Sequence, residues 1–154
     1  MSPHARRGRT EFTVFNALIL AVLVAIAGSV GIPLLESANH EAQSSSLRQS
    51  LRTLRSQIEL YKVEHAGRPP LLRDGSLPQL LRATDATGNP GPAGGKFPLG
   101  PYLRSGIPIN AATGRSIITA TDTFPPETSS GNGGWLYHQP SGQIAVDLQE
   151  YLDQ

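Results

Sequence analysis

The sequence predicts an α+β fold, in which a long N-terminal helix, with a transmembrane half and an amphipathic soluble half, packs against a small antiparallel β-sheet. Three observations lead to this fold class. No charged residue occurs from Phe12 to Leu35. Apolar residues then recur at helical spacing as far as Tyr61. Gly and Pro gather after Gly67, where short segments rich in β-branched and aromatic residues alternate with turns.

These observations divide the 154 residues into four segments. Residues 1–11 form a basic, leader-like segment, and residues 12–35 are predicted to be a transmembrane helix. Residues 36–66 continue as an amphipathic soluble helix. Residues 67–154 form a loop-rich head with a small β-sheet.

The uncharged run of residues 12–35 would rise about 36 Å as a helix, enough to cross a hydrocarbon core of about 30 Å. Arg6, Arg7 and Arg9 precede it, which places the N-terminus in the cytoplasm. A cleaved signal peptide is one alternative, although its apolar core has only about 7–15 residues. A buried core helix is another, but a domain this small could not cover a helix that is apolar on every face.

We expect the long helix to be interrupted at Pro33, which Gly28 and Gly31 closely precede. Proline removes one helical hydrogen bond and clashes with the preceding turn, so these three residues predict a flexible joint.

The soluble half of the helix carries one apolar stripe, with successive spacings of 4, 3, 4 and 3 residues. Three arginines point away from the stripe and are interpreted as a solvated helix face. Gly67 and the two following prolines of "HAGRPP" end the helix. The stripe is Leu47, Leu51, Leu54, Ile58 and Tyr61, and the arginines are Arg48, Arg52 and Arg55.

The head is predicted to contain a short helix around Pro78 to Arg82 and a strand within "RSIITATDTF". A hairpin is expected in "GGWLYHQPSGQIAVDL", where Trp135, Leu136 and Tyr137 face residues 143–146 across a turn. A sheet of so few strands is not stable by itself in water, so we expect it to pack against the apolar stripe of the helix.

Four blocks in order resemble the type IV pilin-like proteins, and most closely the major-pseudopilin-like subunits of type II secretion. They are "FTVFNALILAVLVAIAGSVGIP", "LRTLRSQIELYKVEHAGRPP", "ATDATGNPGPAGGKFPLGPYLRSGIPINAATG" and "GGWLYHQPSGQIAV". The resemblance implies a single-pass protein of the bacterial inner membrane with its head in the periplasm. It also implies a degenerate N-terminal methylation motif.

The degenerate motif lies at Glu11, Phe12 and Asn16. The family has Gly before the Phe, where its peptidase cuts, and Glu where Asn16 stands. Cleavage would create an ammonium group that this Glu neutralises, so the two departures together predict an unprocessed subunit. Two alternatives stay open, namely a merely tolerated polar residue at Asn16 and a cut at Gly8.

No catalytic constellation is recognised, so the chain is not expected to be an enzyme. There is no cysteine, and the four histidines form no metal-binding pair. No cofactor is expected, although calcium is an alternative with Asp122 as the first candidate ligand. With a net charge of +1, no nucleic-acid partner is expected.

The implied function is that of a structural subunit in a periplasmic filament that moves secreted proteins. Its expected partners are membrane lipid, further copies or related pseudopilins, and the inner-membrane platform of the secretion system. The alternative is a membrane-tethered, non-polymerising binding module with pilin architecture.

Overall fold

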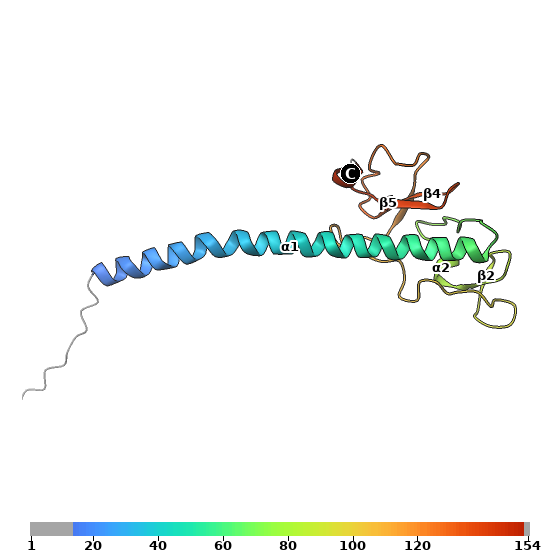
Figure 1. The fold of residues 1–154 in the computed structure, drawn as a ribbon, viewed down its shortest axis with the longest axis horizontal. Helices are drawn as coiled ribbons and strands as arrows, with labels where there is room; N and C mark the ends of the chain where they lie inside the picture. Colours follow the sequence, from blue (N-terminus) through green and yellow to red (C-terminus); the bar gives the residue numbers. More distant parts are fainter. Residues whose placement is uncertain (1–13, 153–154) are drawn as a thin grey trace, which may run out of the picture. The chain divides into compact units, whose positions relative to one another are not determined.

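The computed structural model describes residues 14–152, with the side chains of residues 14–16, 20 and 23–38 excepted. The chain forms two compact units, Met1–Glu41 and Ala42–Gln154. Helix α1 spans Val14–Glu64 and contributes to both (Figure 1). Its side chains are described without interruption from Asn39 onward.

Helix α1 ends in a left-handed turn at Ala66 and Gly67, with φ angles of 56° and 79°. The Gly67 amide donates to the Lys62 carbonyl at 2.7 Å, a bond that spans five residues and is typical of a Schellman cap. Within the second unit, the cap and the two prolines after Arg68 turn the chain back toward the helix.

Two small sheets and two short helices follow. The first sheet pairs β1 (Ala83–Thr84) with β2 (Pro90–Gly91), after the short helix α2 (Pro78–Leu81). The second has the order β3 (Ile118–Ala120), β4 (Trp135–His138) and β5 (Gln143–Val146), and the 3-10 helix η1 (Gln149–Tyr151) comes last.

The predicted hairpin is confirmed. Strands β4 and β5 are antiparallel, with Trp135 opposite Val146 and His138 opposite Gln143, and they run side by side in Figure 1. The turn closes with the Gly142 amide donating to the His138 carbonyl at 2.9 Å. The short helix expected around Pro78 is also present.

The core of the second unit lies between α1, α2 and the second sheet. The side chains of Trp135 and Tyr137 are fully buried, and each polar end is satisfied. The Trp135 indole donates to the Pro108 carbonyl at 2.9 Å, and the Tyr137 hydroxyl donates to the Pro70 carbonyl at 2.8 Å. The other buried members include Leu47, Leu54, Ile58, Tyr61, Leu77, Leu80, Ile118, Ile144 and Val146.

The predicted fold class is wrong in two respects, although the class α+β holds. First, the strands do not make one antiparallel sheet. They form two sheets, and β3 runs parallel to β4, with Ile118 opposite Trp135. The connection through residues 121–134 is long enough to carry the chain back to the end at which β3 began.

Second, the predicted transmembrane helix at residues 12–35 is wrong. Over the residues that the structure describes, no helix is both long enough and apolar enough to cross a membrane. The prediction rested on the absence of charged residues from Phe12 to Leu35, and a run without charge is not by itself a membrane span. The prediction of a single-pass inner-membrane protein with a periplasmic head is overturned by the same finding.

Candidate functional site

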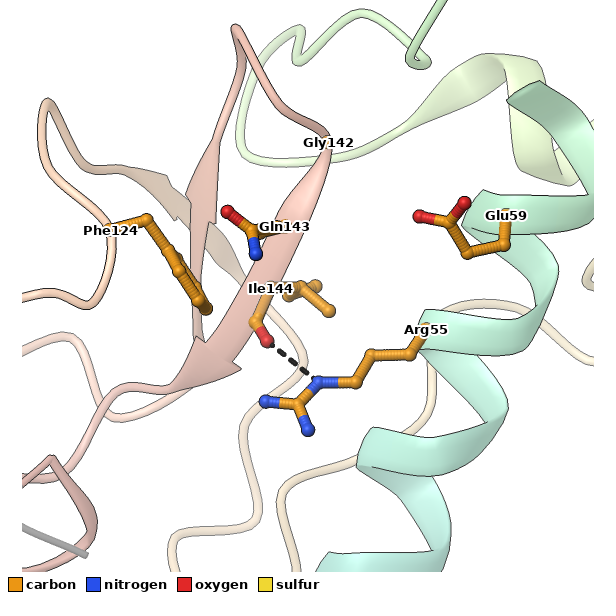
Figure 2. A pocket seen from close by; sticks show the side chains of 6 residues that line it. All are labelled: Arg55, Glu59, Phe124, Gly142, Gln143 and Ile144. Atoms are coloured by element: carbon orange, nitrogen blue, oxygen red, sulfur yellow. Dashed lines mark hydrogen bonds between the residues drawn. The ribbon is translucent and has the colours of Figure 1, made fainter. Parts of the chain in front are cut away.

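A cleft of about 360 Å³ lies in the second unit, between helix α1 and strand β5. Arg55 and Glu59 enter it from α1, one turn apart, as Figure 2 shows. Strand β5 and the turn before it supply Gln143, Ile144 and Gly142, and the loop after β3 supplies Phe124.

A hydrogen bond from the helix to the strand fixes the position of Arg55. Its Nε donates to the Ile144 carbonyl at 3.1 Å, across 89 residues of sequence (Figure 2). The Ile144 side chain is 1% exposed and belongs to the core, so the acceptor is held rigidly. The guanidinium group is therefore anchored along one edge.

Gly142 lets the hairpin approach the helix closely. Its φ of 74° lies in the left-handed region, and a Cβ there would lie 2.8 Å from Pro69 Cβ and 3.3 Å from Lys62 Cδ. A larger residue would push the hairpin away from α1. Gly142 thus permits the close packing of the hairpin beside the cleft.

Arg55 and Glu59 are the charged residues of the lining, and with Lys62 beside Glu59 the three side chains carry a net charge of +1. The Glu59 carboxylate pairs with the Lys62 ammonium group at 2.8 Å, so its charge is offset from within the helix. Arg55 has no acidic partner among the residues that the structure describes. The cleft can therefore attract an anion.

The calcium candidate Asp122 lies in a second, polar cleft of about 280 Å³. Glu127 lines the same cleft, together with hydroxyl-bearing residues of the loop at 121–130. Among the side chains that the structure describes, no group of three His, Asp or Glu residues is placed to hold a metal ion. Calcium binding at Asp122 stays a prediction.

Asp147 was not singled out from the sequence, yet it is the fully buried carboxylate that organises the neighbouring loop. It accepts hydrogen bonds from the Ser129 hydroxyl at 2.8 Å and the Ser130 amide at 2.6 Å. The Ser130 hydroxyl and the Gly133 amide donate to its other oxygen. Burial alone would raise the pKa of Asp147, but these hydrogen bonds together hold it below its ordinary value. Because its partners are donors, the carboxylate does not present a metal site.

His65 belongs to a buried aromatic cluster at the end of α1. Its ring stacks on Tyr61 with the centroids 3.8 Å apart, and Tyr102 meets Tyr61 edge to face at 5.4 Å. The His65 nitrogens lie 2.8 Å from the Tyr61 carbonyl oxygen and 3.0 Å from the Asp85 carbonyl oxygen. Burial raises the pKa of the Tyr61 hydroxyl. The cluster joins the helix end to the loop after β1.

The residues proposed from the sequence fall into three groups. Glu11 and Phe12 lie outside the described residues, and the side chain of Asn16 does too. Gly28, Gly31 and Pro33 lie within the bounds of α1, but their side chains are not described, so the joint stays a prediction. The stripe lies in the second unit, where Leu51 is partly buried and Leu47, Leu54, Ile58 and Tyr61 are at most 2% exposed.

Comparison of the chain with protein-family models, with curated proteins and with solved structures gives no match. The resemblance to pilin-like proteins therefore stays a prediction based on the four sequence blocks.

Proposed function

We propose that the chain is a structural subunit of pilin-like type, which assembles with further copies or related subunits into a filament that acts in protein secretion. One observation carries this proposal. In the first unit, Leu18, Ile19 and Val22 of α1 are 61%, 43% and 51% exposed. Contact with another protein is one use of neighbouring exposed apolar side chains on a helix.

The spacing of these side chains fits helix packing. Leu18 and Val22 are four residues apart, and Ile19 and Val22 are three apart, so they share one helix face. Packing between helices uses such rows of side chains, with axes about 8–10 Å apart. Side-by-side packing of α1 from several copies would bury this face.

The second unit does not need this face for its own core. Its buried cluster begins at Leu47 and takes every other member from later residues. The apolar side chains at positions 18, 19 and 22 are therefore available for contacts between subunits.

The proposal is tested by disulfide crosslinking, which the sequence favours because it has no cysteine. Val22→Cys is oxidised in the cells that produce the protein, and the products are separated without reductant. We expect Val22→Cys to give crosslinked dimers only when oxidant is added. The double variant Leu18→Cys/Val22→Cys should give a series of larger crosslinked oligomers. Lys96→Cys in an exposed loop of the head is the matched control. Crosslinking at Val22 no greater than at Lys96 would contradict the proposal.

A second candidate function is that of a non-polymerising binding module. The anchored Arg55 in the cleft beside β5 favours it, because that cleft lies wholly within the second unit. The same crosslinking experiment discriminates between the two candidates, since a strictly monomeric product at both Val22 and Leu18 favours the module.

A further inference from the structure

We propose that the Arg55 cleft binds a carboxylate that is attached to an apolar group. The carboxylate is borne either by an acidic residue beside an apolar one in a partner peptide, or by a small carboxylic acid. This inference goes beyond assembly, because every lining residue belongs to the second unit and none lies near Leu18 or Val22 in sequence.

The guanidinium group of Arg55 is already held in position before such a ligand binds. Its Nε is occupied by the Ile144 carbonyl, while Nη1 and Nη2 have no hydrogen-bond partner among the residues described. A carboxylate matches the fork of guanidinium nitrogens with two parallel hydrogen bonds. Anchoring through Nε also lowers the entropy that Arg55 loses when a ligand binds.

The charge balance of the cleft favours an anion over a cation. Glu59 could have attracted a cation, but the Lys62 ammonium group lies 2.8 Å from its carboxylate. Arg55 is then the uncompensated charge of the lining. The aliphatic stem of Lys62 lies beside Gly142, where a Cβ would be 3.3 Å from Lys62 Cδ.

The remaining lining explains why the carboxylate should carry an apolar group. The Phe124 ring is half-buried and stands across strand β5 from the helix, as Figure 2 shows. The exposed Gln143 amide lies between Phe124 and Arg55 and offers both a donor and an acceptor. A volume of about 360 Å³ holds much more than one water molecule and lies at the lower end of the range for ligand pockets.

The test uses the full chain labelled with ¹⁵N and two pairs of probes. One pair is 3-phenylpropionate and its neutral amide, 3-phenylpropionamide. The other pair is the peptide acetyl-Val-Glu-Phe-amide and its counterpart with Gln in place of Glu. We expect both acids to shift the backbone amide signals of Phe124, Gln143 and Ile144, and added salt to weaken the binding.

Substitutions assign the binding to Arg55. We expect Arg55→Gln to weaken binding of either acid about tenfold or more, since it removes a charge-assisted pair. Arg52→Gln is the matched control, because it removes the same charge from the same helix outside the cleft, and it should change affinity less than about twofold. Arg55→Lys keeps the charge but loses the fork, and should fall between them. It also keeps the test usable if Arg55→Gln does not fold.

The two pairs of probes distinguish the sources of the carboxylate. Tighter binding of the acidic peptide assigns the cleft to a partner protein, and tighter binding of 3-phenylpropionate assigns it to a small carboxylic acid. Either result upholds the proposal. It is overturned if the neutral amides bind as well as the acids, if Arg55→Gln binds like the unmodified chain, or if neither acid shifts the signals of the cleft.

Discussion

Asp147 is a buried charge on which one loop of the second unit depends. Its carboxylate is fully buried and accepts hydrogen bonds from two hydroxyl groups and two backbone amides of residues 129–133. A buried carboxylate is tolerated only when it is satisfied in this way. The loop from β3 to β4 therefore takes its conformation from one side chain beyond the end of β5.

Replacement of Asp147 by Asn should lower the free energy of unfolding by about 2–3 kcal/mol at neutral pH, because an amide cannot accept all four donors. The folded-state pKa of Asp147 lies below its unfolded value. The contribution of the charge is thus complete above the unfolded pKa of about 3.9 and is lost as the pH falls through the folded pKa.

The measurement is urea unfolding of the unmodified chain and Asp147→Asn at neutral and acidic pH. The difference between them should narrow below about pH 4. Asp122→Asn, at an exposed aspartate, is the control and should cost less than about 0.5 kcal/mol. If the difference in unfolding free energy between the two proteins were the same at every pH, the role given to the charge of Asp147 would be refuted.

Gly142 gives a second test at the scale of one residue. Gly142→Ala should lower the free energy of unfolding by about 2–3 kcal/mol, because it adds a contact with Pro69 to the cost of a left-handed residue. Gly114→Ala is the matched control, since its φ is 72° and a Cβ there meets nothing within 4 Å. The control should cost only about 1 kcal/mol. Equal losses in thermal unfolding would show that the close approach is not the cause.

At the scale of the elements, helix α1 and the β4–β5 hairpin stabilise each other. The helix provides Leu54 and Ile58, the hairpin provides Tyr137 and Ile144, and all four side chains are at most 1% exposed. A two-stranded hairpin is marginal in water by itself. The helix stripe is the surface that makes it stable.

Leu54→Ala should therefore cost about 2–5 kcal/mol of unfolding free energy, as large-to-small changes in a core do. Leu60→Ala provides a control of identical chemistry on the same helix, where the side chain is 45% exposed, and should cost less than about 1 kcal/mol. Chemical denaturation followed by circular dichroism measures both. Similar losses for the two variants would contradict the assignment of the stripe to the core.

The sequence predicts those features that depend on local chemistry. The helical period of Leu47 to Tyr61 and the turn residues at 139–142 are local signals, and the hairpin follows from them. The direction of β3 is not local, because it depends on the path of residues 121–134 between strands. Arg55 was interpreted from the sequence as a solvated side chain. Its hydrogen-bond acceptor, the Ile144 carbonyl, is 89 residues away, and no residue near Arg55 in sequence indicates this contact.

At the scale of the whole molecule, the chain consists of two units of different character. The unit Ala42–Gln154 has its own core, its own sheets and the Arg55 cleft. The unit Met1–Glu41 includes the exposed apolar side chains of Leu18, Ile19 and Val22. The two proposals, ligand binding and assembly, therefore concern separate parts of the chain.

A fragment of residues 42–154 should fold without the preceding residues, because the core cluster begins at Leu47. We expect a cooperative thermal transition within a few degrees of that of the full chain, measured by circular dichroism. The signals of the Trp135 indole should be retained as a sign of the intact core. A non-cooperative transition would contradict the division into two units.

Assembly through the first unit is the central claim, and sedimentation velocity of the purified full chain at increasing concentration tests it most directly. We expect species larger than the 16.4 kDa monomer that grow with concentration. Val22→Glu should shift them to the monomer, because it places a charge in the apolar contact. Sedimentation of the unmodified full chain as a 16.4 kDa monomer at every concentration would contradict the account.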